Sequence, residues 1–234
     1  MPVVKEKANK HHYWGHRKRL RERFLRSGLE GFADYEVVEL ILTLAIPRSD
    51  VKVPAKELIA RFGSLRGILD ASIEALSSIA GIGSVTPVAL KIIKATATLY
   101  LQQGAEDIEL HADPERLTQF WRMRIGALQN EVFEVAYLDS GYRLLHNGVD
   151  RLEEGTVDRA AVYPRKVIEA ALKRGAAAIV LAHNHPNADL MPSEHDKVLT
   201  RAIVLAAETV HLKVVDHLIV SLQDTFSFRK AGLL

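Results

Sequence analysis

Hydrophobic and polar residues follow two different periods along the chain. Up to about residue 101, apolar residues recur every three or four positions, as in an α-helix that buries one face. Beyond Glu131, short alternating or continuous apolar runs are typical of β-strands. The sequence therefore predicts a helical domain at residues 1–101, a linker at 102–116 and an α/β domain at 117–234.

Capping and stop residues delimit four helices in the first domain. Asp34 can cap the first of them, which Pro47 stops, and Gly63 and Ser72 mark the end of the second and the start of the third. The apolar side of the first helix is expected to include Val37, Leu40, Ile41 and Leu44. The other three helices are expected at residues 54–61, 73–79 and 85–101.

Strands and helices alternate in the second domain. The run Ala176–Ala182 is wholly apolar and predicts a buried central strand. Further strands are expected at residues 131–138, 142–146, 213–221 and 225–228, and helices at 164–174 and 194–209. This order predicts an α/β domain with a mixed sheet.

Composition narrows the class of protein and of metal site. The 234 residues include 48% hydrophobic residues and no cysteine, which excludes disulfides, cysteine zinc sites and thiol nucleophiles. The longest clean apolar run has seven residues, far fewer than the roughly 18 that a membrane span needs. The basic N-terminus leads into no apolar signal core, so a cytoplasmic protein without membrane contact is expected.

Positive charge is concentrated at the N-terminus. Residues 1–28 hold nine Lys and Arg against two Asp and Glu, a net charge of +7, whereas the remaining residues have a net charge of −5. Such a segment can attract phosphate backbones. On charge alone, we interpret it as a solvated, partly disordered arm.

His183 and His185 follow the predicted central strand, and Asp196 lies one turn into the next predicted helix. In extended backbone, residues two apart point to one side, and Asp196 can point back to the same place. Two imidazoles and one carboxylate give three protein ligands for Zn²⁺ and leave a fourth position open for water, as in catalytic zinc sites. Zinc lowers the pKa of such a water to about 7.

Simpler interpretations exist for the same residues. Ser193 and Asp196 form a Ser-x-x-Asp capping box, which is common without any metal. A His-x-His triplet can occur by chance in a surface loop. The letters HNH at 183–185 spell the name of a nuclease class, but no ββα-metal unit follows them. The whole combination of His-x-His and Ser-x-x-Asp is more specific than either part, and capping and metal binding can coexist.

The pattern His183-x-His185-x7-Ser193-x-x-Asp196 resembles the JAMM (MPN+) signature of zinc-dependent metallopeptidases and isopeptidases. That signature also requires a glutamate upstream at the start of a strand, and Glu131 stands in the corresponding place. The resemblance implies that Glu131 is the general base, which takes a proton from the attacking water and returns it to the leaving amine. It implies that Ser193 helps to hold the oxyanion of the tetrahedral intermediate.

Nearly the whole chain, from about residue 14 to 229, resembles the RadC family, also described as UPF0758. The resemblance implies a JAMM/MPN domain, related in topology to cytidine deaminases, preceded by a helix-hairpin-helix-like region. The family historically has a DNA-repair label. The segments that carry the resemblance are ADYEVVELIL (33–42), RFGSLRGILDAS (61–72), HNHP (183–186), DHLIV (216–220) and FSF (226–228).

The chain departs from the family beside the proposed zinc ligands. Relatives usually continue HNHP with Ser-Gly-Asp, where this chain has Asn187-Ala188-Asp189. Alanine resists backbone angles that glycine permits, so the loop can take a different path. We interpret Asp189 as a loop residue. Glu134 is expected on the opposite side of its strand from Glu131, His195 is expected to be exposed, and His217 could approach the site but is expected to be a hydrogen-bonded core or edge histidine.

Residues 76–93 resemble a helix-hairpin-helix. Gly81-Ile82-Gly83 would form the hairpin, whose amides can bind one phosphate, and Lys91 can add charge. Such contacts are independent of nucleotide sequence and sensitive to salt. The alternative is a structural turn between two helices without any ligand.

Together these features favour a hydrolase that cleaves amide or isopeptide bonds in an unknown protein or peptide and binds one zinc ion per chain. His183, His185 and Asp196 are the expected ligands. A DNA-associated protein whose JAMM domain serves for binding or assembly is the main alternative. Metal-dependent phosphoester hydrolysis is a third possibility, although it usually uses two metals and more ligands than this cluster offers.

Overall fold

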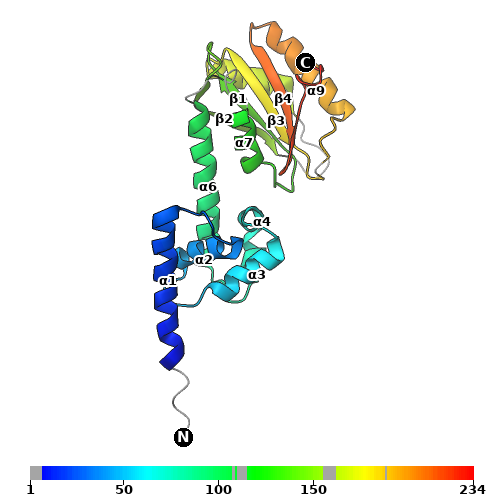
Figure 1. Cartoon of the computed structure of the whole chain (residues 1–234). Coiled ribbons are helices and arrows are strands. Elements are labelled where there is room, and N and C mark those ends of the chain that lie inside the picture. The colour runs from blue at the N-terminus through cyan, green and yellow to red at the C-terminus, as the bar shows by residue number, and fades with distance from the viewer. Residues whose placement is uncertain (1–6, 107–108, 110–114, 155–161, 188) are drawn as a thin grey trace. The chain divides into compact units, whose positions relative to one another are not determined.

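A computed structural model describes residues 7–106, 109, 115–154, 162–187 and 189–234, with side chains from Gly15 onward. The chain forms two compact units, unit 1 at Met1–Thr96 and unit 2 at Ala97–Leu234. Figure 1 labels the helices and strands of both units. Among the described residues, no helix combines the length and apolar character that crossing a membrane requires.

Unit 1 is helical, as the sequence predicts. Its core gathers apolar side chains from five helices, including Val38, Leu58, Ile68, Leu76 and Leu90. Serine hydroxyls cap the two short helices, since Ser64 accepts from the Gly67 amide and Ser72 from the Ala75 amide. The helices are α1 (Lys7–Ser27), α2 (Asp34–Ala45), α3 (Lys52–Phe62), α4 (Leu65–Asp70), α5 (Ile73–Ser77) and α6 (Val85–Glu106), and α6 continues into unit 2.

The expected disordered arm is wrong for residues 7–27, which form helix α1. Leu20 is buried, and the Arg17 guanidinium donates to the carbonyl oxygens of Ile46, Pro47 and Ser49. Arg23 forms a 2.6 Å ion pair with Glu36. These contacts attach the basic segment to the loop after α2 and to α2 itself, so part of its charge is satisfied within unit 1.

Helix α2 differs from prediction in its cap and its buried face. Ala33 occupies the N-cap position, and Asp34 is the first helical residue. Val38 and Leu42 are fully buried, whereas Leu44 is 77% exposed. Apolar residues cover most of this helix, so the sequence pattern alone does not select the face that packs against α3.

Unit 2 is built on a mixed five-stranded sheet with the order β2-β1-β3-β4-β5. The β3–β4 pair is parallel and the other pairs are antiparallel. This confirms the predicted α/β domain with a mixed sheet. The strands are β1 (Val132–Leu138), β2 (Leu144–Glu154), β3 (Ala178–Asn184), β4 (Lys213–Val220) and β5 (Thr225–Ser227).

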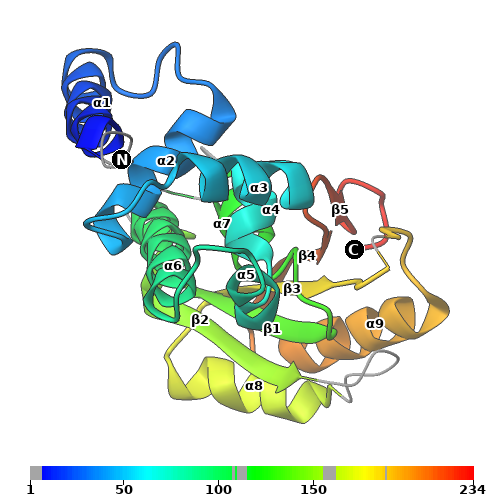
Figure 2. The same cartoon turned by 90° about the horizontal axis from the view of Figure 1, so that it is seen from below.

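Helices cover both faces of the sheet. Helices α8 (Pro164–Lys173) and α9 (Glu194–Glu208) pack on one face, where Phe133, Ile179 and Leu181 meet Val167 and Ile203. Figure 2 shows α8 and α9 on this side. Helix α7 (Glu115–Arg124) packs on the other face through Leu117, Phe120 and Trp121. Helix α7 was not predicted, and it begins within the predicted linker 102–116. Helix α6 also extends into that linker, through residues 102–106.

A bulge in β4 decides the direction of the His217 side chain. Ile179 pairs with Val214 but Val180 pairs with Asp216, so β4 has one extra residue at this point. The extra residue reverses the alternation of side chains along the strand. His217 therefore pairs with Leu181 and faces the side of the sheet that α8 and α9 cover.

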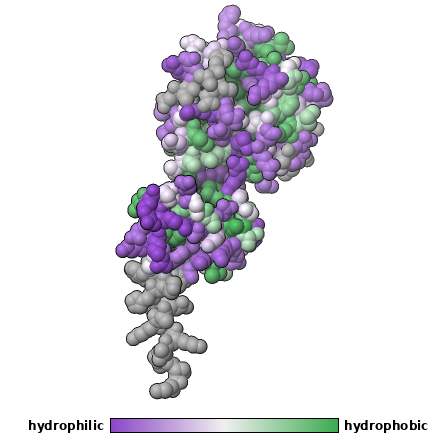
Figure 3. Space-filling model, viewed as in Figure 1, coloured by the Kyte–Doolittle hydropathy of each residue, from purple (hydrophilic) through white to green (hydrophobic). Residues whose placement is uncertain are grey.

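The surface of each unit is mixed in character. In Figure 3, hydrophilic and hydrophobic side chains alternate over the visible face of both units. Scattered exposed apolar residues are normal for folded proteins, because polar groups are too few to cover the surface.

Candidate metal centre

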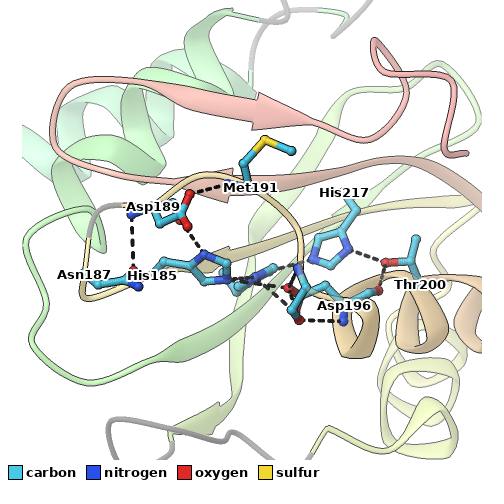
Figure 4. Close-up of polar contacts among 9 residues, drawn as sticks. His185, Asn187, Asp189, Met191, Asp196, Thr200 and His217 are labelled. Atoms are coloured by element: carbon cyan, nitrogen blue, oxygen red, sulfur yellow. Dashed lines mark hydrogen bonds and ion pairs between the residues drawn. The ribbon is translucent and has the colours of Figure 1, made fainter.

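His183, His185 and Asp196 come together where β3 ends and α9 begins. One ligand atom from each residue lies within 4.8 Å of the others. The two Nε2 atoms are 3.0 Å apart, His183 Nε2 is 3.4 Å from Asp196 Oδ1, and His185 Nε2 is 3.6 Å from Asp196 Oδ2. In Figure 4, the His185 imidazole points toward the Asp196 carboxylate. The structure thus brings together the three residues that the sequence predicts as metal ligands.

Local structure explains this convergence. Side chains alternate along β3, so His183 shares the face of Ile179 and Leu181. The Ser193 hydroxyl accepts from the Asp196 amide at 3.2 Å and donates to Asp196 Oδ2 at 2.6 Å. The Ser193 amide donates to the same oxygen at 2.8 Å. The capping box is present and orients the Asp196 carboxylate, so the capping role leaves Asp196 within the cluster that could hold a metal ion.

Hydrogen bonds on the far side of each imidazole leave the Nε2 atoms for a metal ion. His185 Nδ1 lies 2.5 Å from the Asp189 carbonyl oxygen, to which it can only donate. A neutral His185 therefore has its lone pair on Nε2. His183 Nδ1 lies 2.8 Å from His217 Nε2. Carbonyl and side-chain partners of this kind fix the orientation of metal-binding histidines.

Electrostatics favour neutral His183 beside an ionised Asp196. Burial lowers the pKa of His183 to about 4. Burial also acts to raise the pKa of Asp196, but its contacts with His185 and His183 and the hydrogen bonds from Ser193 outweigh it, so the pKa of Asp196 is lowered. For His185, burial is outweighed by the nearby Asp196 carboxylate and the hydrogen bond to the Asp189 carbonyl, and the pKa is raised.

The donor set fits a transition-metal ion. Two imidazole nitrogens and one carboxylate oxygen are ligand types that zinc and related divalent ions prefer. In both histidines, Nε2 is the nitrogen that faces Asp196. His183 and Asp196 are buried. Within the part of the chain that the structure describes, this is the one cluster of three such side chains close enough to hold a metal ion.

Glu131 directly precedes β1, beside the metal centre. Phe133 pairs with His183, and the same register continued by two residues brings Glu131 opposite His185. Burial raises the pKa of Glu131, and the nearby His185 and Asp196 act on it in opposite directions, lowering and raising it. Its assignment as the general base stays a prediction.

Asn184, the residue between the two histidines, fixes the segment that contains Glu131. Its amide nitrogen donates to the carbonyl oxygens of Leu128 and Asn130, both at 3.1 Å. Its Oδ1 accepts from the Val132 amide at 2.9 Å. The side chain is fully buried, so these three bonds attach the start of β1 to the end of β3.

Glu134 lies on the other face of the sheet from His183, as expected. Its carboxylate accepts hydrogen bonds from Trp121 Nε1 and from the Nε atoms of Arg124 and Arg151, at 2.8 to 3.2 Å. Trp121 belongs to the core under α7. Glu134 therefore links α7, β1 and β2 and does not reach the metal centre.

The remaining histidines near the motif agree with expectation in part. His195 is exposed, as predicted. His217 is fully buried and hydrogen-bonded, as predicted, but its partners are His183 and Thr200. Thr200 was not predicted as part of the site, although its position one helical turn after Asp196 places it on the same side of α9.

The loop that departs from the family pattern also touches the centre. The Asn187 side chain accepts from the Asp189 amide at 3.2 Å, and Asp189 Oδ1 accepts from the Met191 amide at 2.9 Å, as Figure 4 shows. Asp189 is thus a loop residue, as interpreted, and its carbonyl holds His185. Ala188 lies outside the described residues.

Two family models match this chain. The model described as UPF0758 N-terminal matches residues 12–88, and the model described as RadC-like JAB domain matches residues 111–233. The chain belongs to the UPF0758 family. It is 37% identical over 217 residues to a UPF0758 protein of Burkholderia cenocepacia, covering 93% of this chain and 84% of that protein. It is 36% identical over 230 residues to a UPF0758 protein of Fusobacterium nucleatum, covering 94% and 97% of the two chains.

The UPF0758 N-terminal region contains the predicted hairpin. Gly81 has a φ of +81°, and Gly83 has open space where a Cβ would stand. Lys91, however, donates from Nζ to the Leu69 carbonyl oxygen at 2.8 Å, and Lys94 pairs with Asp70 at 2.6 Å. Both ammonium groups are thus bound within unit 1. The phosphate contact of Gly81, Gly83 and Lys91 stays a prediction.

Proposed function

We propose that this UPF0758 chain is a zinc-dependent hydrolase of amide or isopeptide bonds in a protein or peptide substrate, with one zinc ion per chain. The observation that supports it most is the convergence of His183 Nε2, His185 Nε2 and the Asp196 carboxylate within 4.8 Å. The match to a RadC-like JAB domain supports the same class. When bound there, zinc would supply Lewis acidity to the hydrolysis.

Glu131 is the general base in this proposal. It removes a proton from the attacking water and returns it to the leaving amine. Burial raises the pKa of Glu131, which makes its carboxylate a better proton acceptor than a fully solvated glutamate. The Asn184 hydrogen bonds hold the backbone on both sides of it.

Ser193 is the proposed support for the oxyanion. Its hydroxyl donates to Asp196 Oδ2 at 2.6 Å and turns toward the oxyanion when the tetrahedral intermediate forms. The Ser193 amide also donates to Asp196 Oδ2, so Asp196 keeps one hydrogen bond when the hydroxyl turns away.

Metal content and hydrolysis test this function together. The purified chain is expected to contain about one zinc ion and to cleave members of a peptide and isopeptide library. His183→Ala should lose the metal, whereas Glu131→Gln should keep it and be inactive. His195→Ala is the matched control, since this exposed histidine lies next to the cluster outside the donor set.

Two results would contradict the proposal. A chain that binds no zinc lacks the proposed centre. A zinc-loaded chain that hydrolyses no member of the library favours the alternative, a DNA-associated protein whose JAMM domain serves for binding or assembly.

Non-specific DNA binding by unit 1 is a second proposal, favoured by the arginines on α1. Arg19, Arg21 and Arg26 are exposed, unlike Arg17 and Arg23, which bind groups within unit 1. Exchange of these three exposed residues for Gln should weaken duplex binding and lower its dependence on salt concentration. Unchanged affinity at low salt would reject the proposal for α1.

A further inference from the structure

A buried chain of hydrogen bonds leads from α9 through β4 to the first histidine of the metal centre. Thr200 Oγ1 lies 2.6 Å from the Asp196 carbonyl oxygen and 2.6 Å from His217 Nδ1. His217 Nε2 lies 2.8 Å from His183 Nδ1. Thr200 and His217 are 1% and 0% exposed, so water does not compete for these bonds. Figure 4 shows Thr200 between the Asp196 segment and His217.

A single hydroxyl hydrogen sets the direction of this chain. A carbonyl oxygen only accepts, so the Thr200 hydroxyl donates to the carbonyl of Asp196. The Thr200 oxygen can then only accept from His217, which places the His217 hydrogen on Nδ1. A neutral His217 has its lone pair on Nε2 and accepts from His183 Nδ1.

The consequence appears at His183. With its hydrogen on Nδ1, His183 presents a lone pair from Nε2 toward His185 Nε2 and Asp196 Oδ1, at 3.0 and 3.4 Å. If the chain ran in the opposite direction, the hydrogen of His183 would lie on Nε2, where it would block a metal ion.

We propose that Thr200 and His217 are positioning residues that hold His183 in the tautomer able to bind the metal ion. This inference rests on the proposed zinc function and adds two positioning residues behind the three predicted ligands. The β4 bulge supports it, because that bulge turns His217 toward the face of His183. The pair would thus do for His183 what the Asp189 carbonyl does for His185.

A packing role is the alternative, since the His217 ring also stacks on Phe228 with centroids 4.7 Å apart. The pair Thr200→Val and Thr200→Ser separates the two roles. Valine keeps the branched shape and removes the hydroxyl, whereas serine keeps the hydroxyl. Thr209→Val is the control, because the Thr209 hydroxyl at the C-cap of α9 also donates to a backbone carbonyl, that of Ala206 at 2.7 Å, at the far end of the helix from Asp196.

Two measurements on the full chain give the answer. Zn²⁺ affinity, measured by competition with a chromogenic chelator, should fall about 10- to 100-fold in Thr200→Val. It should stay near the wild-type value in Thr200→Ser and Thr209→Val. In the metal-free wild type, long-range ¹H–¹⁵N NMR spectra should show the His183 hydrogen on Nδ1, and in Thr200→Val a mixture of both tautomers.

A second pair of variants tests His217, the middle residue of the hydrogen-bond chain from Thr200 to His183. His217→Gln keeps an oxygen that can accept from His183, whereas His217→Leu keeps only an apolar side chain. Zinc affinity should fall further in His217→Leu than in His217→Gln.

Equal zinc affinity in Thr200→Val and Thr200→Ser would overturn the inference, as would a hydrogen on Nε2 of His183 in the metal-free wild type. If Thr200→Val does not fold, the wild-type spectrum still decides. A wild type that binds no Zn²⁺ but shows the Nδ1 tautomer would reject the zinc function alone, so the two failures can be told apart.

Discussion

The metal centre of unit 2 and the hairpin of unit 1 use their polar side chains in opposite ways. At the metal centre, His183 and His185 satisfy their Nδ1 atoms within the protein and direct Nε2 toward Asp196. At the hairpin, the Lys91 ammonium group itself is bound, to the Leu69 carbonyl, and burial lowers its pKa.

The difference teaches that internal partners decide what a motif can do. A histidine has two ring nitrogens, so one internal hydrogen bond can hold the ring while the other nitrogen stays available. A lysine has one charged group, so a hydrogen-bond partner within the fold leaves its ammonium group less available to bind a phosphate. The comparison therefore predicts strong effects at the metal centre and weak effects at Lys91.

The largest effect on the rate of hydrolysis is expected at Glu131, and Glu134 in β1 provides the matched control. Glu131→Gln should lower the rate of hydrolysis by about 10²- to 10⁴-fold, because a general base is lost, without loss of zinc. Glu134→Gln should keep activity per folded molecule but lower the free energy of unfolding, since two arginines lose their carboxylate partner. Rates, zinc content and urea unfolding of both variants check this. Equal activity of the two variants would remove Glu131 from the mechanism.

A large loss of stability is expected from Asn184→Ala. The change leaves the Val132 amide and the carbonyls of Leu128 and Asn130 without their partner, at about 1–3 kcal/mol for each buried group left unpaired. Asn130→Ala removes an exposed asparagine side chain nearby and should change the free energy of unfolding by no more than about 0.5 kcal/mol. Urea unfolding of both variants provides the measurement. Similar values for the two would mean that Asn184 does not fix the start of β1.

The metal-free protein should lose stability as the pH falls from about 6.5 to 4. Burial lowers the pKa of His183 to about 4 and that of His217 well below its ordinary value, so the unfolded chain binds more protons in this window. Each group can contribute at most about 1.4 kcal/mol per pH unit. The pKa of His185 is raised, which gives the opposite sign but mainly above this window.

Urea unfolding at several pH values, with a chelator present, measures this slope. His195→Ala should keep it, because that histidine is exposed. A flat profile between pH 6.5 and 4, also in Glu131→Gln, where the raised pKa of Glu131 no longer opposes the slope, would show that His183 and His217 are not held neutral. Zinc affinity should fall over the same range, since protons compete for the ligands.

The fold was predictable where apolar runs were short and bounded. The wholly apolar run Ala176–Ala182 predicted a central strand, and β3 covers most of it. Helix α7 was missed because polar and charged residues occupy six of its ten positions, although Leu117, Phe120 and Trp121 have the spacing of one buried face. Helix α1 was missed because charge suggested a solvated arm, whereas contacts distant in sequence, such as that of Arg17 with Ile46, attach it to unit 1.

The cluster of His183, His185 and Asp196 was predictable because a strand end and a helix start bring the three residues together over a short stretch of chain. The Ser-x-x-Asp pattern marked the helix start itself. Thr200 and His217 were not predictable in the same way. Their contact depends on the parallel pairing of β3 with β4 and on a bulge that a single sequence does not reveal.

The smallest effects are expected at the hairpin, where substitutions of two glycines distinguish an effect on stability from an effect on DNA binding. Gly81 has a φ of +81°, and an added Cβ would lie 3.0 Å from Pro54 Cγ, so Gly81→Ala should cost roughly 1–2 kcal/mol of stability. A Cβ at Gly83 meets nothing within 4 Å, so Gly83→Ala should leave stability nearly unchanged.

Any loss of duplex affinity in Gly83→Ala would therefore report on binding alone. If the hairpin amides contact a phosphate, the added methyl group should weaken binding by about 0.5–1.5 kcal/mol, the value of one hydrogen bond. Lys91→Met should change the affinity less, because the lysine is already bound to Leu69. Titration of a fluorescent duplex at two salt concentrations compares the three chains. A greater loss in Lys91→Met than in Gly83→Ala would reverse the contrast, since Lys91 would then leave the Leu69 carbonyl to meet the phosphate.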